Sequence, residues 1–482
     1  MKPLLLLSLL WLPLAGLSPA QKQAQTDDLT RSNLERALEA VQPNNIKADL
    51  YFLADDAMAG RNSPSVEQRI AARFLRSRLM RLGFEPGFHD AYLFPYEKAR
   101  YALDADACQL TLTIGKTAFQ LKIGQDYFLS PSARSERHSE QAPILYLGDA
   151  RDAHKVEAPV EGAWVLVDGD RRPSRSTQSK LFERGALGML VMPSGEDGKS
   201  VADTYGRYFA NMTELGFGEI PEANQPGALF LAESAAEHLQ PLLKGLKPGA
   251  KLACTVSETC SLRSDPAKLE NVIGIWPGSD PVLRNDVIIL SAHYDHVGVR
   301  DDGDVYNGAD DNGSGTSGML ALCEALAQYG PMRRTIMIQW VSAEEKGLWG
   351  SYAWTTHPWF PEGMKPVCNI NIDMIGRNAE DELLITPTKN HEEYSWLTQM
   401  AEKHRSEEGF KSLGSADDYY WRSDHANYRK NLNVPVIFLF ADIHEDYHKV
   451  TDTPDKINYN KITHVVRLVL RILDDLQDDK LG

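Results

Sequence analysis

The residues of this chain that could do chemistry are concentrated between positions 291 and 345. Three clusters of histidines and acids lie there: Ser-Ala-His293-Tyr-Asp295-His296, Asn307-Gly-Ala-Asp310-Asp311-Asn312-Gly-Ser-Gly and Ser342-Ala-Glu344-Glu345-Lys-Gly. The strand-like apolar runs 287–290 and 335–341 precede the first and the third cluster. Open α/β sheets build their sites at the carboxyl ends of strands, so we expect these side chains to share one sheet edge. Imidazole and several carboxylates together suit one or two divalent metal ions.

Each cluster by itself also has an ordinary structural explanation. Acids among glycines, as at Asp310-Asp311, are common in a turn before a helix. The doublet Glu344-Glu345 is followed by Lys-Gly and would suit a solvated loop. Two further candidates, Asp373 and His448, lie downstream. Asp373 ends a strand-like run, and His448 lies in a polar segment near the end of the chain. The combination of histidines and at least three acids at strand ends favours a metal site.

The motifs in this order resemble peptidase family M28, the zinc exopeptidases. The resemblance covers roughly residues 270–476 and, more loosely, 53–83. It is carried by Ala292-His-Tyr-Asp-His, Gly308-Ala-Asp-Asp-Asn-Gly-Ser-Gly, Ser342-Ala-Glu-Glu-Lys-Gly, Asn371-Ile-Asp-Met-Ile-Gly, Arg422-Ser-Asp-His-Ala-Asn-Tyr and Asp446-Tyr-His-Lys-Val-Thr-Asp-Thr-Pro. Five of these segments in order form a specific pattern.

The resemblance implies a role for seven residues and two zinc ions per chain. Asp311 would bridge both ions, a water between the ions would be the nucleophile, and Glu344 would be its general base. Asp295 would orient a zinc-bound histidine from behind. The remaining ligands would be His293 and Asp373 for one ion and Glu345 and His448 for the other. His448 is preferred to His444 because it precedes the Thr-Asp-Thr-Pro stretch.

The implied activity is that of an aminopeptidase acting on the N-terminus of peptides. A carboxypeptidase of the same superfamily is the alternative, and it would need a cation for the substrate's carboxylate, such as Arg377 or Arg422. A glutaminyl cyclase-like enzyme would work with one zinc. A non-catalytic binding protein with a structural zinc is disfavoured, because such sites are more often closed by cysteine and these motifs contain none.

Strand-like and helix-like segments alternate from Glu270 onward, which predicts an α/β/α sandwich with a mixed, mostly parallel central sheet. Residues 27–105 and 266–482 are assigned to this catalytic domain. In its first part the apolar spacing predicts helices at 34–41 and 46–53 and a third helix that stops at Gly83. Ser65 and Gln68 have the spacing of a capping box at the start of that third helix.

Residues 106–265 are assigned to a mostly β inserted domain. Alternating polar and apolar residues predict paired strands at 110–114 and 118–123 around Gly115-Lys116. A helix is predicted at 177–184. The helix-Gly-Ala-x-Gly-strand order around Gly185 resembles the protease-associated (PA) domain inserted in several exopeptidases.

Bulk properties limit the partners and the compartment. The chain has 482 residues and a formal net charge of −16, which argues against nucleic-acid binding because phosphate neutralisation needs clustered Lys and Arg. Residues 1–20, with one lysine, a short leucine-rich run and small residues before Gln21, predict a signal peptide and hence an exported, periplasmic or secreted protein. No later run is long enough to span a bilayer. Peptides are the expected partners, and the oligomeric state is left open.

The chain has five cysteines, so at least one thiol is free whatever pairs form. Cys254 and Cys260 are close in sequence, and in an oxidising compartment we expect them to form a disulfide. Cys323 and Cys368 lie in apolar patterns and are expected to be small core residues.

Overall fold

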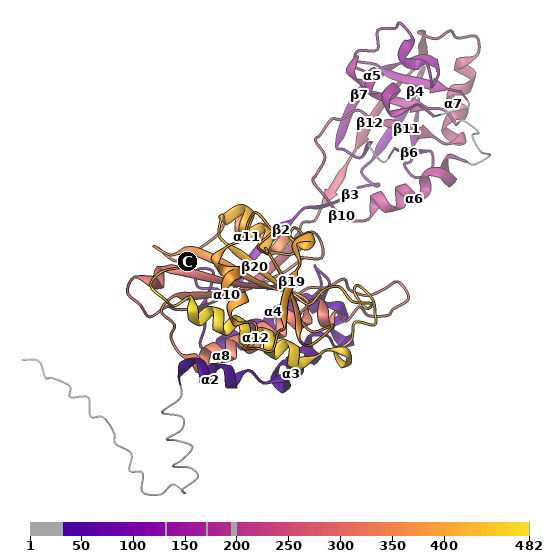
Figure 1. The fold of residues 1–482 in the computed structure, drawn as a ribbon. Helices are drawn as coiled ribbons and strands as arrows, with labels where there is room; N and C mark the ends of the chain where they lie inside the picture. Colours follow the sequence, from indigo (N-terminus) through magenta and orange to yellow (C-terminus); the bar gives the residue numbers. More distant parts are fainter. Residues whose placement is uncertain (1–31, 131–132, 170–171, 194–199, 482) are drawn as a thin grey trace, which may run out of the picture. The chain divides into compact units, whose positions relative to one another are not determined.

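The computed structural model describes residues 32–130, 133–169, 172–193 and 200–481, which form two compact units (Figure 1). Unit 1 takes the residues up to Tyr96 and from Lys268 onward, and unit 2 is Glu97–Ala267. The sequence had assigned these parts as 27–105 with 266–482 and as 106–265. The predicted signal peptide, residues 1–20, lies outside the described residues.

A nine-stranded sheet forms the centre of unit 1, in the order β1-β14-β16-β15-β17-β20-β18-β19 with β2 also pairing β14. Four neighbours in its middle, β16, β15, β17 and β20, run parallel, whereas β14 and β18 are antiparallel to their inner neighbours. The expected α/β class and mixed sheet are therefore confirmed. The strands are β1 Glu85–Pro86, β2 Leu93–Lys98, β14 Ala267–Trp276, β15 Asp286–His293, β16 Thr335–Val341, β17 Lys365–Ile372, β18 Glu382–Thr386, β19 Ser412–Ser415 and β20 Val436–Phe440.

Helices cover both faces of this sheet. Alternate residues of the strands point to opposite faces, so Ile288 and Leu290 of β15 belong to one core cluster and Val287 and Ile289 to another. The first face packs against α2 (Asn33–Ala40), α3 (Pro43–Leu53), α4 (Val66–Leu82), α8 (Gly315–Tyr329), α10 (Trp396–His404) and α12 (Tyr459–Asp475). The second face packs against α9 (Trp349–Thr356) and α11 (His425–Leu432).

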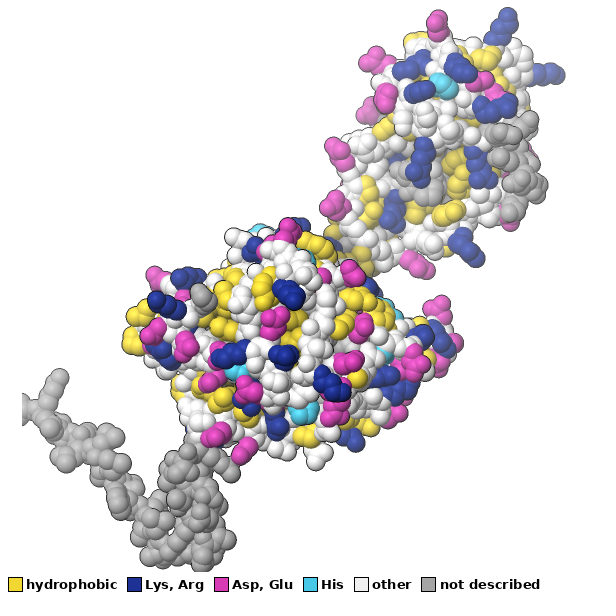
Figure 2. Space-filling view, in the orientation of Figure 1, with side chains coloured by type: hydrophobic (Ala, Val, Ile, Leu, Met, Phe, Trp, Pro, Cys, Tyr) yellow, Lys and Arg dark blue, Asp and Glu magenta, His cyan; other side chains and the backbone are white. Residues whose placement is uncertain are grey.

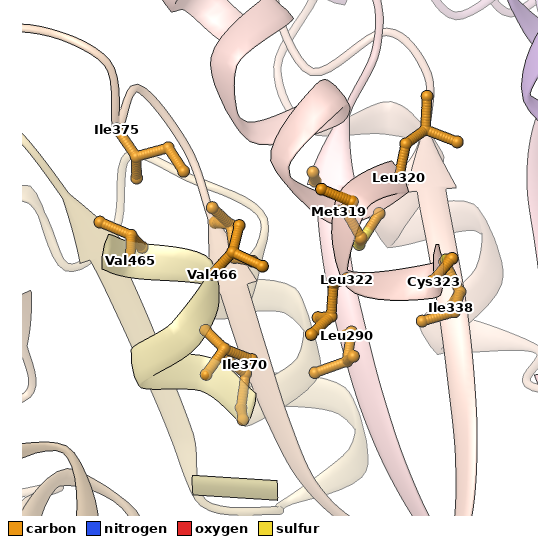
Figure 3. Packing of buried hydrophobic residues seen from close by; sticks show 14 of the residues in the cluster. Leu290, Met319, Leu320, Leu322, Cys323, Ile338, Ile370, Ile375, Val465 and Val466 are labelled. Atoms are coloured by element: carbon orange, nitrogen blue, oxygen red, sulfur yellow. The ribbon is translucent and has the colours of Figure 1, made fainter. Parts of the chain in front are cut away.

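The larger core cluster joins α8 and α12 to the parallel strands. The central strands β15 and β16 are buried on both faces, as expected for parallel strands covered by helices on both sides. Figure 3 shows the contact, with helix residues Met319, Leu322, Cys323, Val465 and Val466 among strand residues Leu290, Ile338 and Ile370. This packing fixes the parallel strands, and with them the loops at their carboxyl ends.

Helix α4 begins at Ser65 and ends at Gly83, as predicted. The Ser65 side chain accepts the backbone N–H of Gln68, and Gly83 has the left-handed backbone that ends the helix. The second half of the predicted capping box is absent, because the Gln68 side chain donates to the Tyr294 hydroxyl instead. A buried partner from another element has replaced the local one.

Unit 2 contains an eight-stranded sheet in the order β5-β4-β12-β7-β8-β9-β11-β6 and a three-stranded sheet in the order β10-β3-β13. The predicted hairpin is β4 and β5, which pair antiparallel. The strands are β3 Arg100–Leu103, β4 Gln109–Ile114, β5 Thr117–Leu121, β6 Tyr127–Leu129, β7 Arg137–Asp149, β8 Trp164–Asp168, β9 Gly188–Val191, β10 Gly216–Phe217, β11 Ala228–Leu231, β12 Lys251–Cys260 and β13 Leu262–Ser264. The resemblance of this unit to a PA domain stays a prediction.

Unit 2 also has three described helices, of which the sequence predicted only the first. These are α5 (Arg175–Glu183), α6 (Val201–Thr213) and α7 (Glu233–Leu243). Helix α6 carries Gly206 in its interior and α7 carries Pro241, and both residue types disfavour a helix. Burial of Tyr205 and Met212 of α6 and of Leu239 of α7 in the core of unit 2 outweighs that local preference.

The predicted disulfide between Cys254 and Cys260 is wrong. Both cysteines lie on the single extended strand β12, and both are free thiols. Six residues of strand span roughly 20 Å, several times the reach of a disulfide. Closeness in sequence is a poor guide to pairing when the intervening residues form a strand.

The described residues contain no helix that is both long and apolar enough to cross a bilayer. On the face shown in Figure 2, Lys and Arg side chains are mixed with Asp and Glu over both units. The charge of that face is therefore distributed and not gathered into a basic patch.

Candidate metal centre and active site

The carboxyl ends of the parallel strands bring the predicted site residues together. His293 is the last residue of β15, and Asp373 follows β17 directly. Glu344 and Glu345 lie three and four positions after the end of β16. Asp311 lies in the short helical turn η6 (Ala309–Ser314) that leads into α8. His448, in the loop after β20, completes the group and has a left-handed backbone, with a φ of 53°.

The first set of candidate ligands is His293, Asp311 and Asp373. Nε2 of His293 lies 3.3 Å from Oδ1 of Asp311 and 3.1 Å from Oδ1 of Asp373. The second oxygen of Asp373 accepts a hydrogen bond of 2.7 Å from Ser423. One carboxylate oxygen is thereby held in place by the protein and the other is presented to the site.

The second set is Asp311, Glu345 and His448. Nε2 of His448 lies 3.1 Å from Oδ2 of Asp311 and 3.1 Å from Oε2 of Glu345. The other Glu345 oxygen, Oε1, lies 2.8 Å from Nδ1 of His296. Asp311 thus turns one oxygen to each histidine, which is the placement that a bridging carboxylate requires.

The two sets fit zinc in donor type and in spacing. Zinc takes imidazole and carboxylate ligands at about 2.0–2.1 Å in tetrahedral geometry, so two of its ligands lie about 3.3 Å apart. The four ligand–ligand distances of 3.1–3.3 Å agree with that value. Proximity alone also gives two other groups of three possible ligands. One is His293, Glu344 and Asp373, and the other is His296, Asp311 and Glu345. We favour His448 over His296 as the ligand, because its nitrogen lies between both carboxylates of the second set.

The carboxylates of the site favour positive charge on the two candidate histidine ligands. Burial lowers the pKa of His293, but attraction by Asp373 and Glu344 outweighs burial, and the net pKa is raised well above its usual range. Burial also opposes charge on His448, yet Asp311 and Glu345 raise the pKa of His448 to about 10. The site thus has more buried carboxylates than positive charges, and this excess keeps both imidazoles protonated. A bound divalent cation would neutralise the excess negative charge.

Glu344 and Asp295 stand beside the ligands. Burial raises the pKa of Glu344 well above its usual range and raises the pKa of Asp295 to about 6. Oδ1 of Asp295 accepts the backbone N–H of Glu344 at 3.1 Å and lies 3.8 Å from Nδ1 of His293. That imidazole nitrogen is closer to the backbone oxygen of Asp295, at 3.3 Å. The Asp295 carboxylate therefore contacts the loop that carries Glu344 as directly as it contacts the histidine.

Arg61 is a positioning residue that the sequence analysis missed. Its guanidinium is buried and donates to four backbone carbonyls, those of Leu53, Tyr294, Asn307 and Gly308, at 2.5–3.0 Å. These hydrogen bonds tie the 3₁₀ helix η1 (Asp56–Arg61) to the loop that leads to Asp311. The Gly-Arg-Asn sequence gave no sign that the arginine would be buried.

Asp452 and the pair of Asp310 and His444 support the same loop. The carboxylate of Asp452 accepts the backbone N–H groups of Asp310 and Asp311 at 3.0–3.1 Å. Oδ2 of Asp310 lies 3.2 Å from Nε2 of His444. In the sequence, the stretch Thr451-Asp452-Thr-Pro was used only to prefer His448 to His444 as a ligand. In the structure, Asp452 itself holds the backbone of the Asp310-Asp311 turn. His444 points to the first acid of the Asp310-Asp311 doublet and His448 to the second.

A pocket is lined by candidate site residues together with apolar and aromatic side chains. The candidate site residues are His293, Asp311, Glu344, Glu345 and Asp373. The rest of the lining is Arg422 and Ser423 with the apolar and aromatic residues Met374, Tyr419, Phe438, Phe440, Ile443 and Tyr447. Arg377, the other cation considered above, is paired with Asp446 at 2.8 Å, whereas exposed Arg422 lies over the Tyr419 ring.

The fold and the two ligand sets describe an α/β/α domain with a candidate metal centre at the carboxyl edge of its sheet. Residues 271–473 match the model of Peptidase family M28. The expected likeness to that family is therefore confirmed over these residues. The family model covers the later part of unit 1 and does not reach unit 2.

Individual proteins agree with this assignment. Over 207 residues the chain is 28% identical to Aminopeptidase YwaD of Bacillus subtilis (strain 168), covering 42% of this chain and 43% of the relative. Over 194 residues it is 31% identical to Leupeptin-inactivating enzyme 1 of Streptomyces exfoliatus, covering 39% and 38%. The chain thus spans about two fifths of the length of these curated relatives. The solved aminopeptidase from Aneurinibacillus sp. strain AM-1 matches 91% of this chain and 95% of its own, with a TM-score of 0.50 and 18% identity, which shows a common fold.

Proposed function

We propose that the protein is a zinc-dependent aminopeptidase that holds two zinc ions and releases the N-terminal residue of peptides. The observation that carries the proposal is the placement of Asp311 between His293 and His448, one oxygen to each, beside the buried Glu344. Two sets of ligands that share one carboxylate suit a pair of ions better than a single one. The names of the relatives, which include aminopeptidases, favour the same activity.

The ligands would be His293, Asp311 and Asp373 for one ion and Asp311, Glu345 and His448 for the other. Bound zinc would act as a Lewis acid and lower the pKa of a coordinated water toward neutrality.

The residues of the chain would do the rest. Glu344 takes a proton from the attacking water and gives it to the leaving amine, and its raised pKa lets it hold the proton between the two steps. The hydrogen bond of its backbone N–H to Asp295 fixes the loop that aims it.

The lining of the pocket supports peptides that begin with a large apolar residue. Phe438, Phe440 and Ile443 line the same pocket as the candidate ligands and offer apolar contact area to a substrate side chain. Arg422 is the feature that favours the alternative, a carboxypeptidase, because it could bind a substrate's terminal carboxylate.

Export also belongs to the proposal, on the strength of the signal-like residues 1–20. Soluble peptides outside the cytoplasm would then be the substrates.

The deciding experiment compares one short peptide, Leu-Gly-Gly, in three forms: unmodified, N-acetylated and C-amidated. An aminopeptidase releases free leucine from the first and the third form and leaves the second intact. Cleavage that survives acetylation but fails on the amide would establish the carboxypeptidase instead. Activity should disappear with a chelator and return with added zinc, and retention of activity in the chelator would exclude a metal-dependent enzyme.

A further inference from the structure

Two cysteines of unit 2 face each other across neighbouring strands. Strands β4 and β12 pair antiparallel, with Leu110 opposite Glu258 and Gln109 opposite Thr259. One more step in this register places Cys108 opposite Cys260. Directly opposed residues of an antiparallel pair have Cα atoms about 4.5–5.5 Å apart, and this range lies inside the 4.4–6.8 Å that disulfides span.

The side chains of these cysteines lie on the same side of the strands. Cys108, Leu110, Cys260 and Val256 all belong to one buried core cluster, as alternation along both strands requires. The two thiols contact each other through a hydrogen bond, and the Cys108 sulfur also accepts the backbone N–H of Ser261 at 3.3 Å. Both side chains are therefore directed into one small volume.

We propose that Cys108 and Cys260 form a disulfide when the protein meets an oxidising disulfide, such as oxidised glutathione or a thiol–disulfide oxidoreductase. The Cys108 thiolate attacks one sulfur of that disulfide, forms a mixed disulfide and releases one thiol. The Cys260 sulfur then attacks the Cys108 sulfur, loses its proton and releases the second thiol. Two protein thiols are oxidised and one external disulfide is reduced to two thiols, so the exchange balances.

The local charges agree with Cys108 as the attacking sulfur. The hydrogen bond from Cys260 lowers the pKa of Cys108, and the buried Arg137 nearby acts in the same direction. The thiolate is the reactive form of cysteine. Both sulfurs are almost fully buried, so exchange takes place during folding, after the paired strands bring the two thiols together and before the core of unit 2 closes around them.

No other pair of cysteines competes. Cys254 lies six positions before Cys260 on the same strand, and Cys323 and Cys368 are buried in the core of unit 1. The five thiols of the sequence therefore give one pair and three singles.

The position of the pair gives the bond a structural role. Cys108 lies where the chain enters the eight-stranded sheet from β3, and Cys260 lies where it leaves toward β13, the strand that pairs with β3. A bond here joins the first and last strands, in chain order, of the eight-stranded sheet and closes a loop that contains nearly the whole unit. Long loops are those whose closure most restricts the unfolded chain.

The test is thiol mapping of the full-length chain after refolding with oxidised and reduced glutathione. Iodoacetamide labelling in denaturant, followed by proteolysis without reductant, should leave three alkylated cysteines and one cross-linked peptide pair containing Cys108 and Cys260. Reductant should convert that pair to two alkylatable peptides. Five alkylated cysteines, or a cross-link that uses any other cysteine, would overturn the proposal.

Variants separate the bond from mere burial of sulfur. Cys254→Ser is the matched control, because it changes a buried cysteine of the same strand that has no opposed thiol. Reductant should lower the melting temperature of unit 2 by about 5 °C or more in the wild type and in Cys254→Ser. It should produce no shift in Cys108→Ser or Cys260→Ser. An equal response to reductant in all four proteins contradicts the proposal. If a variant does not fold, the peptide map of the wild type still tests the disulfide. The outcome does not depend on the proposed peptidase activity.

Discussion

At the scale of single residues, the two acids of each doublet, Asp310-Asp311 and Glu344-Glu345, have different contacts. Asp310 lies against His444 while Asp311 lies between His293 and His448. Glu345 contacts His448, whereas Glu344 forms no ion pair with any residue that the structure describes, and its pKa is raised. In each doublet the second residue is the candidate ligand, and the first has a separate task.

Glu344→Gln tests this division directly. The amide keeps the size of the side chain but cannot accept a proton, so turnover should fall by about 10²–10⁴-fold or more. Zinc content measured by elemental analysis should stay near two ions per chain. Normal turnover in this variant would remove Glu344 from the mechanism.

Asp311→Ala should behave in the opposite way. It removes both shared carboxylate oxygens, so the variant should bind little zinc even though its fold, followed by circular dichroism, is kept. Full zinc occupancy in Asp311→Ala would contradict the bridging role, whatever the activity.

At the scale of elements, loops after strands carry the chemistry, and buried hydrogen bonds hold those loops. Arg61 links η1 to the Gly308 segment, and Asp452 holds the backbone of Asp310 and Asp311. Both come from segments distant in sequence from the loop they support. The candidate metal site is thus assembled by tertiary contacts and not by local sequence alone.

Arg61→Met should destabilise unit 1 by about 3 kcal/mol, because several buried carbonyls lose their donor. Urea unfolding measures the loss, and zinc affinity should weaken with it because the Asp311 loop is released. Arg61→Lys should be intermediate, since one ammonium cannot reach all four carbonyls. Arg69→Met is the control on exposed surface of α4 and should change the unfolding free energy little; an equal loss there would contradict the proposed role.

Lys461 on α12 gives the protein a pH-dependent stability. Its side chain is buried, donates to the backbone carbonyl of Arg377 at 2.6 Å, and burial lowers its pKa to about 8. Between pH 8 and the unfolded value of about 10.4 the unfolded chain binds more protons than the folded one, so folding gains stability as the pH rises. The unfolding free energy of the wild type minus that of Lys461→Met should therefore increase across this window, by up to about 3 kcal/mol. A difference that stays flat from pH 7 to 10.5 would show that Lys461 titrates normally.

At the scale of the whole molecule, every candidate ligand belongs to unit 1, while the cysteine pair belongs to unit 2. The proposed zinc site and the proposed disulfide therefore lie in different units. The role of unit 2 in the activity stays open to experiment, because no candidate ligand or base comes from it.

Added zinc should stabilise unit 1 selectively. At a free concentration 1,000 times the dissociation constant, binding contributes about 4 kcal/mol to the folded state. Amide hydrogen exchange should slow in the segments around His293, Asp311 and Asp373 and remain unchanged in β7 and β12. A chelator should reverse the effect. Equal protection of both units would mean that zinc acts elsewhere.

The sequence by itself determined the type of chemistry and the class of fold. Ligand residues must have particular side chains, and strand–helix alternation must show the right periods, so both can be found in the chain without coordinates. The Ser65 cap and the β4–β5 hairpin were predictable for the same reason, since they depend on neighbours within a few positions.

Tertiary structure decided what depends on residues distant in sequence. It placed Cys108, and not Cys254, opposite Cys260, buried Arg61 against the backbone of the Gly308 segment, and formed α6 and α7 despite an interior glycine and proline. It also turned the Gln68 side chain from its helix cap to Tyr294. In each case the free energy of packing and buried hydrogen bonding exceeds the local preference, and only the folded chain reveals which distant residues supply it.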